Sequence, residues 1–179
     1  METVQKKLQS TYMILKDQFG YKNHMQAPTI TKVVVSVGTG KVQDKSRVQL
    51  IADRLARITG QKAAPRPARK SIASFKLREG DIIGYQVTLR GGRMRDFLDK
   101  LIHVALPQTR DFRGIKPTAI DEMGNITIGI SDHTIFPETA DEELKDVFSL
   151  AITIVTTATS SAEAEAVLRH LGLPLQLRD

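Results

Sequence analysis

Hydrophobic residues recur along the chain at two spacings, and each spacing predicts one kind of secondary structure. Apolar residues three and four positions apart predict amphipathic helices over residues 3–19, 45–59, 93–106 and 162–171. Alternating or β-branched runs predict strands over residues 30–37, 82–89 and 150–157, and a hairpin over residues 118–130. Because the hairpin and the half-polar strands favour antiparallel pairing, the predicted fold is α+β, with a mostly antiparallel sheet and helices packed on one face.

Glycine, proline and capping residues predict where these elements end. Gly20 and Gly60 follow the first two helices, and Pro107 is expected to stop the third. Ser160 and Glu163 have the spacing of a capping box at the start of the last helix. A length of 179 residues fits a single domain over residues 1–179.

Residues 62–81 have no clear hydrophobic period. Pro65 and Pro67 remove two backbone donors and resist helix formation. The segment is therefore predicted to be a protruding basic loop or an irregular hairpin. Loops of this length in a compact domain are usually functional or disordered.

Charge is distributed unevenly around a whole-chain net charge of +6. Residues 1–61 carry a net charge of +6, residues 62–95 carry +7 and residues 96–179 carry −7. A basic half favours a polyanionic partner, since Lys and Arg that neutralise phosphates release condensed counterions. The acidic half is expected to avoid nucleic acid and could face a basic protein. The alternative for both halves is that the charges coat a solvated surface.

Several classes of protein are excluded by composition. The chain has no cysteine, which excludes a disulfide scaffold, thiol catalysis and cysteine-ligated zinc. Its four histidines show no metal-binding spacing, so neither a metal nor a cofactor is expected. The first residues lack the apolar core of a signal peptide, and no run of 18 apolar residues occurs. A soluble cytoplasmic protein without a membrane partner is therefore expected.

The best enzymatic motif is Val37-Gly38-Thr39-Gly40-Lys41, between a predicted strand and a predicted helix. A phosphate-binding P-loop would need glycine at position 35 and Ser or Thr at position 42, and the chain has valine at both. The two glycines are therefore interpreted as a tight turn, and the chain is predicted not to be an enzyme. A nucleotide-dependent enzyme that uses this turn remains an alternative.

The basic segment points instead to RNA. Arginine offers a planar fork suited to phosphate, and six Lys or Arg residues lie within residues 62–81. Aromatic residues make up only 5% of the chain, with no Trp, so a base-stacking platform is poorly supported. The residues alone predict an α+β protein that recognises the backbone and shape of structured RNA.

Six ordered stretches resemble a known family. They are Met25-Gln26-Ala27-Pro28, Thr59-Gly60-Gln61-Lys62, Ala68-Arg69-Lys70-Ser71-Ile72-Ala73-Ser74-Phe75-Lys76-Leu77-Arg78-Glu79-Gly80, Ile83-Gly84-Tyr85-Gln86-Val87-Thr88-Leu89-Arg90-Gly91, Arg110-Asp111-Phe112-Arg113-Gly114 and Ile135-Phe136-Pro137-Glu138. On these motifs the chain resembles the family of bacterial large-subunit ribosomal protein number five, which binds 5S rRNA. The resemblance implies a structural component of the large ribosomal subunit that helps attach 5S rRNA in the central protuberance.

The resemblance also implies three sets of contact residues. Contacts with 5S rRNA would be made by Ser36, Gln61, Lys62, Thr88 and Arg90, where Ser36 stands at a position at which the family often carries Asn. The basic loop would reach the peptidyl-site tRNA through Arg69, Lys70, Ser71, Phe75, Lys76 and Arg78. A bridge to a basic protein of the small-subunit head is expected from the acidic residues Asp132, Glu138, Asp141, Glu142 and Glu143.

Further partners implied by the resemblance are 23S rRNA and the other large-subunit proteins associated with 5S rRNA. The main alternative is a free RNA-binding or RNA-chaperone module without dedicated 5S specificity. Such a module would bind varied RNAs with similar affinity.

Overall fold

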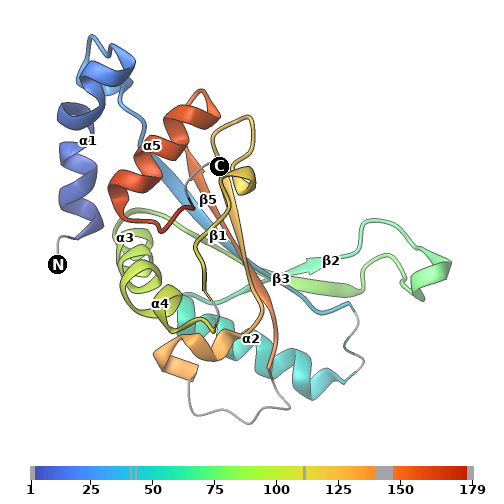
Figure 1. The fold of residues 1–179 in the computed structure, drawn as a ribbon. Coiled ribbons are helices and arrows are strands. Elements are labelled where there is room, and N and C mark those ends of the chain that lie inside the picture. Colours follow the sequence, from blue (N-terminus) through green and yellow to red (C-terminus); the bar gives the residue numbers. More distant parts are fainter. Residues whose placement is uncertain (1–2, 41, 43, 111, 140–146, 177–179) are drawn as a thin grey trace. The chain divides into compact units, whose positions relative to one another are not determined.

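The structure is a computed structural model that describes residues 3–40, 42, 44–110, 112–139 and 147–176 of the chain. Its α-helices are α1 (Val4–Phe19), α2 (Lys45–Thr59), α3 (Gly91–Lys100), α4 (Leu106–Gln108) and α5 (Ser161–Leu171). Its strands are β1 (Ile30–Gly38), β2 (Ala64–Pro67), β3 (Ile82–Leu89), β4 (Ile126–Ile130) and β5 (Leu150–Thr156) (Figure 1). One π-helical segment, Leu101–Ala105, joins α3 to α4.

The five strands form one sheet in the order β2-β3-β1-β5-β4. Strands β2 and β3 pair antiparallel as a hairpin, with Ala64 opposite Gln86 and Arg66 opposite Gly84. The prediction of an α+β fold with a mostly antiparallel sheet is confirmed. Strand β2 was not predicted as a strand: it lies within residues 62–81, which the sequence left open as a protruding loop or an irregular hairpin.

The chain divides into two compact units. Unit 1 comprises Met1–Val33, Arg90–Ile128 and Thr153–Asp179, and unit 2 comprises Val34–Leu89 and Gly129–Ile152. Each unit is described below on its own. The single domain over residues 1–179 stays a prediction.

In unit 1, α1 packs against α3 and α5. Val4 and Leu15 of α1 and Leu168 of α5 are buried. The Asp99 carboxylate on α3 accepts a hydrogen bond of 2.8 Å from the Val4 N–H, which satisfies one free donor at the start of α1. At α5 the Ser160 hydroxyl accepts a hydrogen bond from the Glu163 N–H at 3.3 Å, as expected for the helix start.

Two sequence predictions in unit 1 are wrong in detail. The third helix does not end at Pro107: the chain passes through the π turn and continues to Gln108. Pro107 stands at the second position of α4, directly after the π-helical segment, so proline does not stop the helix at this point. The predicted hairpin over residues 118–130 has only one strand, β4, and its other arm is a single bridge between Ile120 and Ile126.

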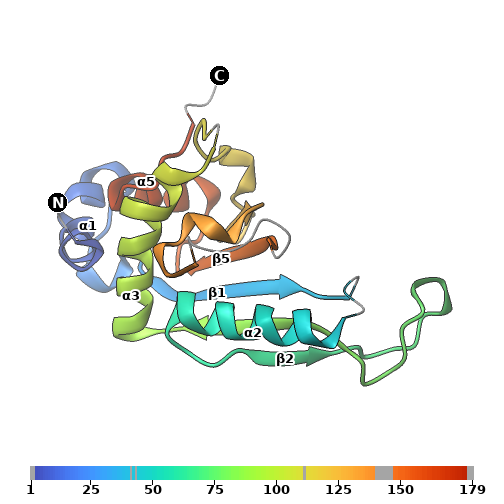
Figure 2. The ribbon, with the colours of Figure 1, turned by 90° about the horizontal axis from the view of Figure 1, so that it is seen from below.

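In unit 2, α2 packs against β3 (Figure 2). Ile51, Leu55 and Ile58 recur on one side of α2, and each is at most 1% exposed. The helix begins at Asp44, whose carboxylate accepts a hydrogen bond from the Ser46 N–H at 2.9 Å, and ends at Gly60 in a left-handed conformation. The predicted bounds of this helix are confirmed.

Candidate RNA interface

The strands of unit 2 bury one face and leave the other face uncovered by α2. The buried side chains are Val35, Val37, Val87, Leu89, Ile130, Leu150 and Ile152. The alternate positions carry the half-buried Val34 and five small or polar residues that are half-buried or exposed, namely Ser36, Gln86, Thr88, Gly129 and Ala151. Because successive strand residues point to opposite faces, these five residues share one surface, called here the open face.

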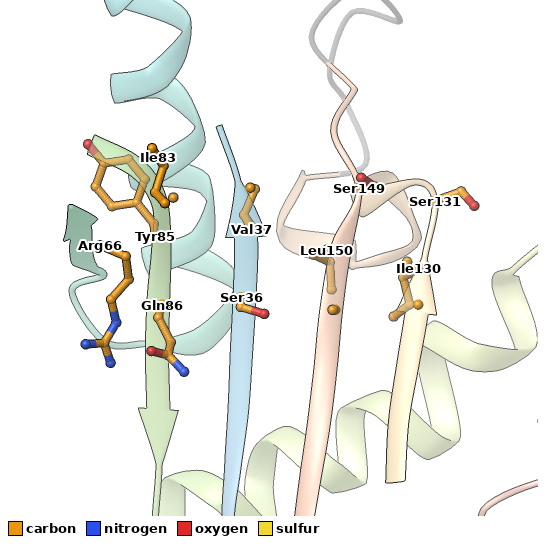
Figure 3. A pocket seen from close by; sticks show the side chains of 14 residues that line it. Ser36, Val37, Arg66, Ile83, Tyr85, Gln86, Ile130, Ser131, Ser149 and Leu150 are labelled. Atoms are coloured by element: carbon orange, nitrogen blue, oxygen red, sulfur yellow. The ribbon is translucent and has the colours of Figure 1, made fainter. Parts of the chain in front are cut away.

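The open face is hollowed by a depression of about 710 Å³ (Figure 3). Ser36, Gln86, Gly129 and Ser149 line it, and α2 lies behind the strands in this view. No long side chain rises from Gly129, where an added Cβ would meet no atom within 4 Å. At Gly129 the strand therefore presents bare backbone to the depression, which lets another macromolecule approach β4 closely.

Arg66 adds a positive charge to this surface. It stands opposite Gly84 in the β2–β3 register, and it lines the depression beside Gln86 (Figure 3). Residues directly opposite each other in an antiparallel pair project to the same side, so Arg66 belongs to the open face. Its exposed guanidinium offers the planar donor geometry that suits a phosphate.

The structure brings together three of the residues expected to contact 5S rRNA. Ser36 on β1 and Thr88 on β3 lie on the open face. The Gln61 side-chain amide donates a hydrogen bond of 3.4 Å to the Thr88 carbonyl oxygen, which fastens the segment after α2 to the end of β3. Gln61 is half-buried, and this hydrogen bond gives its amide a structural role; its contact with 5S rRNA stays a prediction.

The other two of these residues do not line the depression. Lys62 is exposed and lines a different surface, a groove between α2 and the β2–β3 hairpin. Arg90 is exposed at the start of α3, directly after Leu89 in the chain. Their assignment to 5S rRNA stays a prediction.

Residues 68–81 connect β2 to β3 and extend beyond the ends of these strands (Figures 1 and 2). Ile72 and Leu77 exchange two backbone hydrogen bonds, of 3.1 and 3.2 Å, and close the tip. All six residues expected to contact tRNA are exposed, and Phe75 at the tip is 71% exposed. The Ser71 hydroxyl is engaged internally, because it accepts a hydrogen bond from the Glu79 N–H at 2.9 Å. Contact between this segment and tRNA stays a prediction.

The expected bridge residues fall into two groups. The Asp132 carboxylate accepts hydrogen bonds from the Thr134 N–H at 2.9 Å and the Thr134 hydroxyl at 2.7 Å, so it caps the short turn at His133–Ile135. Glu138 is exposed. Asp141, Glu142 and Glu143 lie outside the described residues. The bridge stays a prediction.

Within the part of the chain that the structure describes, neither metal binding nor membrane insertion finds support. No group of three or more acidic or histidine side chains within it could hold a metal ion. None of the helices described there has the length and apolar character needed to cross a membrane. The turn after β1 is closed by hydrogen bonds from the Thr39 N–H to the Ile83 carbonyl at 2.8 Å and from the Val42 N–H to the Thr39 carbonyl at 2.9 Å.

Sequence reasoning counted Arg66 among the basic residues of segment 62–81, but it placed neither Arg66 nor Gln86 and Gly129 on this candidate surface. Alternation in β3 places Gln86 on the same side as Thr88, so the pattern contained a signal for it. Arg66 could not be found in this way, since its face depends on its register with β3. Gly129 could not be found from the sequence either, because it has no side chain that would indicate contact with RNA.

Comparison with known proteins gives consistent similarities. A sequence model described as the C-terminus of the ribosomal L5 family matches residues 82–175, and one described as ribosomal protein L5 matches residues 23–78. The chain is 50% identical over 163 residues to the large ribosomal subunit protein uL5 of Rubrobacter xylanophilus, covering 90% of this chain and 91% of the relative. The uL5 protein of Flavobacterium johnsoniae is 48% identical over 163 residues (90% and 89%), and that of Anaeromyxobacter sp. strain Fw109-5 is 43% identical over 176 residues (98% and 96%).

Proposed function

The chain belongs to the L5 family of ribosomal proteins, and from this premise we propose that its open face binds 5S rRNA. As a member of this family it is a structural constituent of the large ribosomal subunit that binds rRNA, and it is not an enzyme. The nucleotide-dependent enzyme considered from the turn after β1 is thereby excluded. The observation that carries the 5S proposal is the hollowed strand surface with Arg66 at its side.

The side chains of the open face suit an RNA backbone. Ser36, Gly129 and Ala151 are short, so a sugar–phosphate chain can approach the strands closely. Gln86 and Thr88 offer hydrogen-bond donors and acceptors to ribose hydroxyls and phosphate oxygens. Double-helical RNA is recognised mainly by its shape, its phosphates and its 2′-hydroxyls, and this surface presents partners for all three.

The proposal also includes contacts made by other parts of the chain. Residues 68–81 carry the exposed cations Arg69, Lys70, Lys76 and Arg78, which would neutralise phosphates of the peptidyl-site tRNA. The exposed Glu138, with the acidic stretch that follows, would face a basic protein of the small-subunit head. 23S rRNA and other 5S-associated large-subunit proteins complete the proposed partners.

A pair of matched substitutions tests the open face. Gly129→Val adds a side chain where no atom stands within 4 Å of the new Cβ, so the fold should tolerate it. Arg66→Ala removes the charge beside the depression. Each variant is expected to bind 5S rRNA about tenfold more weakly than the wild type, because close approach or a charge-assisted contact is lost.

The control variants introduce the same residue types, valine and alanine, at exposed positions outside the open face. Gln9→Val places an exposed valine on α1, and Arg57→Ala removes an exposed charge from α2. Both should leave 5S affinity within about twofold of the wild type at matched salt. Equal losses in Arg66→Ala and Arg57→Ala, together with unchanged binding of Gly129→Val, would contradict the proposal.

A further inference from the structure

A groove of about 910 Å³ runs between α2 and the β2–β3 hairpin in unit 2, and it is called here the hairpin groove. On the helix side its wall consists of Val48, Ala52 and Ala56. On the hairpin side Pro65, Leu77 and Tyr85 complete an apolar lining. The depression of the open face lies among the strands of the same unit, but neither α2 nor residues 68–81 contribute to it.

The edge of the hairpin groove is positively charged. Lys45, Lys62 and Lys76 line it and are exposed, and the acidic lining residues are Asp53 and Asp81. The Asp81 carboxylate accepts a hydrogen bond from the Arg78 N–H at 2.8 Å, so it is engaged within the hairpin. Three ammonium groups around an apolar floor complement a ligand that combines a flat apolar part with negative charge.

A buried hydroxyl in this groove has no hydrogen-bond partner among the described residues. Thr39 lines the groove and is 2% exposed, and its Oγ1 makes no hydrogen bond to any described residue. The backbone N–H and carbonyl of Thr39 are both paired, so the turn does not depend on the hydroxyl. A buried polar group without a partner is unfavourable, and a ligand that pairs with it would relieve this cost.

We infer that the hairpin groove is a second RNA-contact site, and that it holds a single unstacked nucleotide. A nucleobase has an apolar face for Val48, Ala52 and Tyr85, and polar edges for the Thr39 hydroxyl. Its phosphates would meet the lysines at the edge of the groove. An apolar peptide side chain would fill the lining but leave Thr39 unpaired and the lysines unused. The inference rests on the proposed rRNA-binding function.

The test uses the full chain and a defined probe, hexauridylate that contains one 4-thiouridine. Ala52→Phe fills the groove from a half-buried position on α2, whereas Leu50→Phe adds bulk on the same helix outside the groove. Ala52→Phe is expected to weaken hexauridylate binding about tenfold, and Leu50→Phe to leave it unchanged. Photo-cross-links of the wild type should fall on peptides that line the groove.

Thr39→Val separates binding from a structural role. Replacing an unpaired buried hydroxyl with a methyl group should leave thermal stability unchanged or higher, while hexauridylate binds several-fold more weakly. A structural hydroxyl would instead lower stability when removed. Unchanged affinity in both Ala52→Phe and Thr39→Val, or cross-links confined to the open face, would overturn the inference.

Measuring the affinities of the same variants for 5S rRNA and for hexauridylate distinguishes the open-face proposal from the groove inference. Gly129→Val should lose 5S affinity and keep hexauridylate affinity, which supports both sites. If Gly129→Val keeps 5S affinity while Ala52→Phe loses hexauridylate affinity, the open-face proposal fails and the groove stands. If Gly129→Val, and not Ala52→Phe, loses hexauridylate affinity, the groove inference fails.

Discussion

The Tyr21 hydroxyl donates a hydrogen bond to Glu163 Oε1, joining the segment after α1 to the first turn of α5. Both residues are buried. The second oxygen of the carboxylate accepts hydrogen bonds from the Thr159 N–H at 2.7 Å and the Thr159 hydroxyl at 3.0 Å. One buried carboxylate thus holds two segments that lie far apart in the sequence.

Removing the hydroxyl should destabilise the protein. Tyr21→Phe leaves the buried Glu163 carboxylate without one of its donors, at an expected cost of about 1–3 kcal/mol in the free energy of unfolding. Urea denaturation measures the change. Tyr12→Phe, at a half-buried position on α1, is the control and should shift the free energy by no more than about 0.5 kcal/mol. Equal effects of the two substitutions would show that this hydrogen bond is not important for stability.

The Tyr21 hydroxyl also makes the stability difference between wild type and Tyr21→Phe depend on pH in the alkaline range. Burial raises the pKa of Tyr21 above its ordinary value of 10.0, and the hydrogen bond to Glu163 and its negative charge raise it further. The folded state therefore holds this proton more tightly than the unfolded state. The contribution of this hydroxyl to the free energy of unfolding is fully present below pH 10 and declines as the pH rises above that value. The stability gap between wild type and Tyr21→Phe should narrow above pH 10, and a gap that widens there would contradict the assignment.

Gly84 should be far less tolerant of substitution than Gly129. An added Cβ at Gly84 would stand 2.6 Å from the Val37 carbonyl oxygen on β1, which is closer than atoms can pack. Gly84→Ala is expected to cost about 1–3 kcal/mol because β1 and β3 must separate. Gly129→Ala should cost less, since nothing lies within 4 Å of its new Cβ. Thermal unfolding of both variants tests the contrast, and similar melting temperatures would refute it.

Charge removal in residues 68–81 should separate tRNA contact from 5S binding. Arg69 and Lys70 are exposed and lie outside the open face. The double substitution to alanine is expected to weaken tRNA binding at the peptidyl site of reassembled ribosomes, because two phosphate-neutralising charges are lost. Its affinity for 5S rRNA should stay within about twofold of the wild type. Loss of 5S binding in this variant would mean that the segment is assigned to the wrong RNA.

Hydrophobic periodicity was sufficient to place the elements that bury a face. The predicted bounds of α2 agree with the structure because Ile51, Leu55 and Ile58 must all reach the core. Strand β2 could not be predicted, because its four residues are all exposed and two of them are prolines. Proline is tolerated there because β2 is an edge strand whose conformation is set by pairing with β3.

The candidate site was predictable only in part, for a related reason. Ser36 and Thr88 were assigned from family resemblance, and strand alternation places both on the open face. Whether Arg66 lies on that face depends on the register of β2 with β3, which local sequence does not encode. The unpaired hydroxyl of Thr39 is a property of packing and has no counterpart in the sequence pattern.

The most direct test of the central claim is binding of the purified protein to 5S rRNA across a salt series, with bulk tRNA as competitor. A dedicated 5S-binding protein should form a saturable complex that resists tRNA, with a log–log salt slope that reflects several phosphate contacts. Equal displacement by tRNA, with collapse of the complex at moderate salt, would contradict the claim. That result would identify instead a general RNA-binding module without 5S specificity.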